Sequence, residues 1–220
     1  MWETLSIPWQ AAIEEAWSAY CAGSVPIGAV IVNAAGEIMA RGRNRVGDAG
    51  AGPVHSHELA HAELNALLAL DANRETRHGC TLYTTCEPCL LCLGAFYMSG
   101  VRGLRYASRD PFAGSVNLLG TTPYLSRKPV RVHGPERADL ENVLAALHTE
   151  AALRDYGERS RPVLDAWRVV MPEGVRLGEQ AFQTGRLRQL REAAAAVTEV
   201  VTQLEKRLRI GNGYCNGCNG

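Results

Sequence analysis

The sequence predicts an α/β fold of three layers, with helices on both faces of a sheet, followed by a helical C-terminal extension. Two observations lead to this prediction. Between residues 25 and 133, short runs rich in β-branched residues alternate with longer segments whose apolar residues recur at helical spacing. After residue 153 the strand-like runs stop. Alternating strands and helices are typical of a sheet that is covered on both faces.

The expected elements begin with a helix at 8–21, because Pro8 is acceptable in a first turn. The run 25–33 is rich in β-branched residues and predicts a buried strand. A turn at 34–36 leads to a second strand at 37–44, so the two predict a hairpin. A Gly- and Ala-rich loop follows at 45–56. The remaining elements are a helix (60–73), a strand (80–84), a helix (89–98), strands (102–107 and 129–133) and a helix (139–153).

The composition divides the chain into three parts. Residues 1–153 form the expected first domain, 154–210 a helical extension and 211–220 a disordered tail that carries Cys215 and Cys218. One long helical pattern spans 178–209, and its apolar residues alternate three and four apart. This spacing predicts a heptad seam that packs within the protein or its dimer. The seam consists of Leu187, Leu190, Ala194, Val197, Val201, Leu204 and Leu208.

The bulk composition is that of an ordinary globular protein. Apolar residues make up 46% of the 220, charged residues 21%, and the formal net charge is zero. No basic secretory start precedes an apolar run, and the most apolar stretch, 25–32, is far shorter than the ~20 residues that a membrane span needs. We therefore expect a cytoplasmic protein without a membrane partner.

Zero net charge excludes a global positive field that would attract nucleic acid, so such binding needs a local patch. Residues 1–153 carry a net charge of −3 and residues 154–220 carry +3. A basic run does occur in the first domain. If it gathers on one face, nucleic acid becomes a candidate partner again. Its members are Arg102, Arg105, Arg109, Arg127, Lys128 and Arg131.

Two short patterns suggest a metal site. The first is His61-Ala62-Glu63, and the second places Cys89 and Cys92 one helical turn apart after Pro88. One His and two Cys ligands leave the fourth position of a tetrahedral Zn²⁺ open for water, which is a catalytic arrangement. Zinc lowers the pKa of that water to about 7, and Glu63 can carry its proton to a ring nitrogen and a leaving amine. The pattern H-x-E…P-C-x-x-C is the known signature of zinc deaminases.

The likeness extends beyond these motifs. Segments 25–32 and 81–114, together with Asn44, resemble the bacterial tRNA adenosine deaminase and guanine deaminase branch of the cytidine deaminase-like superfamily. The resemblance covers about residues 8–153. It implies an α/β/α fold, zinc on the His and two Cys just named, Glu63 as the proton shuttle and a dimer. It also implies that Asn44, Ala62 and Pro88 contact the substrate.

The chain departs from that branch in three places: the loop between Asn44 and His61 is longer, Cys86 replaces an aliphatic residue, and no counterpart follows residue 153. These departures affect the substrate more than the reaction. We expect a small substrate, namely a purine-type base, a nucleoside or a related aminated heterocycle. Adenosine-to-inosine deamination in tRNA is the alternative within the enzyme class. An inactive deaminase fold that serves as an interaction module is the alternative outside it.

Other interpretations of the same residues remain open at this point. His57 to His61 spells H-E-x-x-H, the helical zinc pair of metalloproteases. Cys86, Cys89 and Cys92 resemble the start of an iron–sulfur run, and Cys86 could instead close a structural zinc site. His55, His57 and Cys86 are possible residues of the pocket rim. Asn44 could simply cap a turn.

Overall fold

The computed structural model describes residues 1–48 and 54–213 and divides them into two compact units. One unit comprises Ser6–Arg137. The other comprises Met1–Leu5 together with the chain from Ala138 onward. Cys215, Cys218 and most of the expected tail lie outside the described residues. In the part of the chain that is described, no helix is long and apolar enough to cross a membrane.

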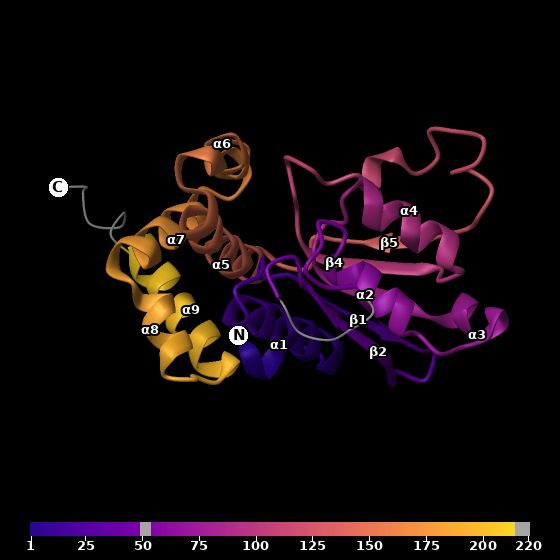
Figure 1. Cartoon of the computed structure of the whole chain (residues 1–220), viewed down its shortest axis with the longest axis horizontal. Coiled ribbons are helices and arrows are strands. Elements are labelled where there is room, and N and C mark those ends of the chain that lie inside the picture. The colour runs from indigo at the N-terminus through magenta and orange to yellow at the C-terminus, as the bar shows by residue number, and fades with distance from the viewer. Residues whose placement is uncertain (49–53, 214–220) are drawn as a thin grey trace. The chain divides into compact units, whose positions relative to one another are not determined.

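The unit 6–137 is built on a five-stranded mixed sheet with the strand order β2-β1-β3-β4-β5 (Figure 1). β1 is antiparallel to both β2 and β3, whereas β3, β4 and β5 are parallel to one another. The expected hairpin is therefore confirmed. The strands are β1 (Gly28–Val32), β2 (Ile38–Arg43), β3 (Thr81–Cys86), β4 (Gly103–Ser108) and β5 (Arg131–His133).

Helices cover both faces of this sheet, which confirms the three-layer prediction. α1 (Ile7–Cys21) packs on one face, where Trp9 meets Tyr83 edge to face at 5.0 Å. α2 (Ala62–Ala69) and α4 (Leu90–Ser99) pack on the other face, over a core that includes Ile31, Leu82 and Phe96. The two faces alternate along each strand because successive strand side chains point in opposite directions.

The predicted helix 60–73 is wrong in its extent, since α2 covers only part of this range and a separate helix starts just after it. α2 ends at Ala69, where Leu70 adopts an extended conformation. α3 (Arg74–Gly79) then begins, and the side chain of Asn73 accepts a hydrogen bond from the Thr76 amide at 2.9 Å. The cap provides a hydrogen-bond acceptor for the Thr76 amide, which has no acceptor within the helix because it lies in the first turn. A short 3-10 helix, η2 (Val116–Leu118), follows β4.

The unit that starts at Ala138 is helical, and it includes the helix expected to complete the first domain. α5 (Ala138–Tyr156) packs against α7 (Pro172–Thr184), where a Cβ on Gly178 would lie 2.5 Å from the Cβ of Thr149. The division between the units consequently falls after Arg137 instead of after residue 153. The remaining helices of this unit are η1 (Trp2–Thr4), η3 (Gly157–Ser160), α6 (Arg161–Val170), α8 (Arg186–Glu192) and α9 (Val197–Gly213).

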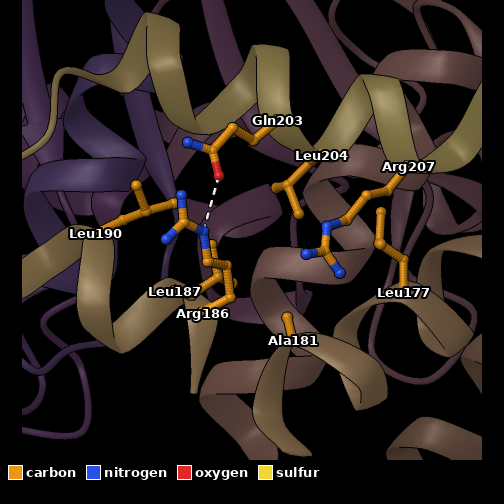
Figure 2. A pocket seen from close by; sticks show the side chains of 8 residues that line it. All are labelled: Leu177, Ala181, Arg186, Leu187, Leu190, Gln203, Leu204 and Arg207. Carbon is orange, nitrogen blue, oxygen red and sulfur yellow. Dashed lines mark hydrogen bonds between the residues drawn. The ribbon is translucent and has the colours of Figure 1, made fainter. Parts of the chain in front are cut away.

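The long helix expected at 178–209 is broken twice. Gly185, with φ 65°, separates α7 from α8, and Ala194, with φ 50°, lies between α8 and α9. The leucines of the predicted seam and Val201 are buried in this unit, whereas Ala194 is exposed. Leu187, Leu204 and their neighbours line a pocket (Figure 2). The pocket has a volume of about 10 Å³. That is room for a single water molecule, so it is a packing defect and not a ligand site.

Close packing of α2 on β2 fixes the helix that carries His61 and Glu63, and it depends on Gly42. A Cβ at this position would lie 2.3 Å from the Ala66 amide nitrogen and 2.4 Å from the Ala62 carbonyl oxygen. We expect Gly42→Ala to lower the free energy of unfolding by about 3 kcal/mol, because the helix must shift. Urea denaturation measures this change.

Gly94→Ala is the matched control, because a Cβ on this α4 residue meets no atom within 4 Å. Alanine is favoured over glycine inside a helix, so this variant should be neutral or stabilised by up to about 1 kcal/mol. Equal stability of the two variants would show that the approach of α2 to β2 is looser than described.

Candidate metal centre

The metal-binding candidates lie at the starts of two helices. His61 is the N-cap of α2, and Cys89 is the N-cap of α4, with Cys92 in the first turn of the same helix. His61 Nδ1 lies 3.5 Å from Cys89 Sγ and 3.3 Å from Cys92 Sγ. The structure therefore brings His61 together with two cysteines that lie 28 and 31 positions further along the chain.

This donor set fits zinc. The three ligand atoms lie within 4.8 Å of one another. With ordinary Zn–N and Zn–S bonds, a tetrahedral ion places its nitrogen and sulfur ligands about 3.6 Å apart, close to the separations observed here. One histidine and two thiolates are ligands that zinc prefers, and no further group of this kind occurs among residues 1–48 and 54–213.

The local electrostatics favour a thiolate. A hydrogen bond from Cys92 is the largest influence that lowers the pKa of Cys89 to about 4, and His61 lowers it further. The hydrogen bond between His61 and Cys89 raises the pKa of His61. The hydrogen bond between Cys92 and Cys89, together with burial, raises the pKa of Cys92. A backbone hydrogen bond at Glu58 also holds the His61 ring. Such an outer contact orients an imidazole for metal binding.

Glu63 is buried beside this cluster, with 3% of its surface exposed. Its Oε1 accepts a hydrogen bond from the Thr84 hydroxyl at 3.3 Å, and its Oε2 lies 3.3 Å from Cys92 Sγ. Burial is the main cause that raises the pKa of this carboxyl. A carboxyl with a raised pKa binds a proton more readily than a free carboxyl does, which suits a group that must accept a proton and then donate it.

The predicted substrate contacts lie near the same helix starts. Asn44 follows β2 and is buried, and the amide of the next residue, Arg45, donates to the Ala60 carbonyl at 2.8 Å. Asn44 Oδ1 accepts from the Val46 amide at 3.1 Å, so this side chain also caps a turn. Ala62 and Pro88 are buried directly beside His61 and Cys89. Their proposed contact with substrate stays a prediction.

The possible rim residues differ in exposure. His55 and His57 are exposed, and His57 Nδ1 accepts from the Leu59 amide at 3.1 Å. Cys86 is only 5% exposed at the end of β3, and burial raises the pKa of its thiol. The position of all three residues at a pocket rim stays a prediction.

The structure also decides the competing metal hypotheses. His57 lies in a turn before α2, so H-E-x-x-H does not occupy one helix face, as a metalloprotease site requires. Cys86 is not part of the metal-binding cluster. Within the described chain it therefore neither closes a structural zinc site nor continues an iron–sulfur run.

Sequence reasoning missed two residues that build this site. Thr84 contacts Glu63 from the sheet, and its inward position could have been found from the alternation along β3. Glu87 accepts hydrogen bonds from the amides of Asp110 and Val116, both at 3.3 Å. The segment that these amides belong to also touches the metal cluster, since Gly114 forms a β-bridge with Cys89. No local pattern indicates such long-range contacts.

We expect Glu87→Ala to destabilise this segment by about 2 kcal/mol, because two amides would be left without their carboxylate acceptor. Hydrogen exchange at Val116 should accelerate accordingly. Glu87→Gln keeps an acceptor oxygen and is the control, for which a smaller effect is expected. Unchanged exchange at Val116 in the alanine variant would contradict this role of Glu87.

Comparisons with known proteins agree with this site. The family described as the cytidine and deoxycytidylate deaminase zinc-binding region matches residues 5–108, which include all four site residues. The tRNA-specific adenosine deaminase of Agrobacterium fabrum is 33% identical over 152 residues, which cover 68% of this chain and 91% of that protein.

A solved guanine deaminase from Nitrosomonas europaea is 27% identical, with a TM-score of 0.50, over 67% of this chain and 85% of that one. The tRNA(Ile)-lysidine synthase of Deinococcus radiodurans is 37% identical over 118 residues, or 53% of this chain. The chain spans only 18% of that synthase. The match to the Agrobacterium enzyme along nearly its whole length, together with the zinc-fitting cluster, shows that the chain belongs to the cytidine deaminase-like superfamily.

Proposed function

We propose that the chain is a zinc-dependent hydrolytic deaminase that removes an exocyclic amine from a purine-type base, nucleoside or related aminated heterocycle and releases ammonia. The observation that carries this proposal is the buried carboxyl of Glu63 beside three protein ligands. Three ligands leave a coordination position open, whereas structural zinc sites are closed by four.

In the proposed mechanism, His61, Cys89 and Cys92 would hold the metal, which would supply the Lewis acidity that lowers the pKa of water to about 7. Glu63 would take up that proton and deliver it to a ring nitrogen. It would then carry a second proton, from the hydroxyl formed on the ring carbon, to the departing amine. The exchange consumes one water and yields the ring carbonyl and ammonia. Thr84 orients the carboxyl from the sheet. Asn44, Ala62 and Pro88 would hold the base edge in place.

Two observations support a purine-type ring. Adenosine appears in the name of the Agrobacterium relative and guanine in that of the Nitrosomonas enzyme. We assign the reaction to the unit 6–137 and an accessory role to the helical unit from residue 138. The alternative, adenosine deamination in tRNA, is favoured by the length of the match to the Agrobacterium protein. An inactive interaction module is disfavoured because all four site residues are intact.

The test is ammonia release by the zinc-loaded chain with purine and pyrimidine bases, nucleosides and tRNA. Turnover of one small purine would support the proposal. Activity on tRNA alone would replace the substrate class and keep the reaction. Stoichiometric zinc with no turnover of any of these compounds would favour the interaction module.

The homodimer also stays a prediction. Leu90 and Met98 on α4 are 66% and 71% exposed, and side chains of this size on one helix face suit contact with a second copy. We expect sedimentation velocity to give a dimer and Leu90→Glu to shift it to monomer. A monomeric native chain would refute this prediction.

A further inference from the structure

Half of the lysines and arginines of the unit 6–137 gather at one end of its sheet. Some of them belong to α3, and the others lie just before β4 or before and at the start of β5. All of these positions are at the end of the sheet where the parallel strands begin. We call this group, together with one histidine, the basic patch. It consists of Arg74, Arg77, His78, Arg102, Arg127, Lys128 and Arg131.

Hydrogen bonds and close packing connect these residues. Arg102 Nη2 lies 3.3 Å from His78 Nε2, and the Arg131 amide donates to the Arg102 carbonyl at 2.8 Å. Arg77 packs against Gly100, where a Cβ would lie 3.6 Å from the Cβ of Arg77. The basic run of the sequence is therefore partly assembled on one edge, and α3 adds cations that the sequence did not suggest.

Lys128 joins the patch from the loop before β5. Its ammonium donates to the Tyr97 carbonyl at 2.6 Å. Burial lowers its pKa, and repulsion from Arg102, Arg74 and Arg127 lowers it further, which agrees with their position at the same end of the sheet as Lys128.

The charges of this patch are not neutralised within the described chain. Elsewhere in the unit, arginines pair with acids, as Arg41 does with Glu14 and Arg105 with Glu136, at 3.0 and 2.8 Å. None of the patch residues forms an ion pair in the described ranges, and Arg77 Nε and Arg102 Nη1 are buried donors that lack a hydrogen-bond partner there. The chain therefore carries a local positive surface although its formal net charge is zero.

We propose that the basic patch binds the phosphate backbone of single-stranded RNA at a surface separate from the metal centre. Arginine forks match phosphate oxygens, and cations spread over three segments suit an extended polyanion better than a single phosphate. Tyr124, which is 47% exposed and 5.7 Å from the Lys128 ammonium, offers a ring on which a base can stack.

The patch and the metal centre lie at opposite ends of β3, since Thr81 begins the strand and Cys86 ends it near the cluster. Six residues of strand span roughly 17 Å. Binding at the patch consequently does not require the proposed deaminase activity, and the two can fail independently.

Fluorescence anisotropy of the full chain with a labelled oligouridine of about 20 nucleotides tests the proposal. Uracil has no exocyclic amine, so this probe is not a deaminase substrate. We expect Arg74→Gln/Arg127→Gln to weaken binding at least tenfold at about 50 mM salt. The slope of log K against log salt should fall in magnitude by about 1.4, or 0.7 for each phosphate that is no longer neutralised.

Arg159→Gln/Arg161→Gln is the matched control, because it removes the same charge from exposed residues of the helical unit. It should leave affinity and slope unchanged. Tyr124→Leu should weaken binding at least about fivefold without changing the slope. Glu63→Gln should bind as the native chain does.

Three results would overturn the proposal. One is no binding of oligouridine at about 50 mM salt. Another is equal loss of affinity in the control pair, which would indicate a net-charge effect. The third is binding to phosphatidylserine vesicles without binding to oligouridine, which would assign the patch to a lipid surface.

Discussion

Glu63→Gln should lower the rate of ammonia release by a factor of about 10²–10⁴ while zinc stays bound. The amide retains the size of the side chain and can still accept from the Thr84 hydroxyl, which lies 3.3 Å from Oε1 in the native chain. It cannot take up a proton, so the transfer to the ring nitrogen and the leaving amine is abolished. Because Glu63 is not one of the three clustered ligands, metal content should be unchanged.

Glu58→Gln is the matched control for this experiment. It makes the same chemical change five positions earlier, on an exposed side chain in the turn before α2. Turnover and zinc content should both stay native. Retained turnover in Glu63→Gln would contradict its role as the proton shuttle. Loss of zinc from that variant would instead make the carboxyl part of the metal site.

Local sequence signals were sufficient for much of the fold. The β-branched run that became β1 is buried along its whole length, and a strand with both faces covered has this composition. The metal cluster could be predicted because its spacing places Cys89 and Cys92 in one helical turn. The prediction that His61 lies beside them relied on a pattern known from other proteins, because the periodicity of a sequence does not indicate which helix starts are close in space.

The errors arose where tertiary contacts outweigh local periodicity. The helix expected at 139–153 was assigned to the α/β domain, but α5 packs against α7, and the choice between partners is not encoded within the helix. The heptad seam continued through Ala194, whose positive φ breaks the helix at a residue without any turn signal. Glu87 was overlooked because its partners, Asp110 and Val116, lie beyond the next strand.

Cys92→Ala should abolish tight zinc binding and with it ammonia release. Removal of a group that orients a ligand typically costs 10–100-fold in metal affinity, so removal of a ligand itself should cost more than about 100-fold. Zinc that binds only the folded chain stabilises it by about 4 kcal/mol at a free concentration near 1,000 times Kd. The native protein should therefore melt at a higher temperature with zinc than after chelation, and Cys92→Ala should melt alike in both conditions.

Cys86→Ala is the control that distinguishes a zinc ligand, as proposed for Cys92, from a cysteine that is only buried. Both thiols are buried, and they occur in the same C-x-x-C-x-x-C run, but Cys86 is absent from the cluster. Its variant should retain one zinc per chain and the stabilisation that zinc confers, with only the small loss that a missing thiol causes in a packed core. If Cys86→Ala lost zinc as Cys92→Ala does, Cys86 would be a fourth ligand. The site would then be closed, and the open position on which the proposed chemistry depends would not exist.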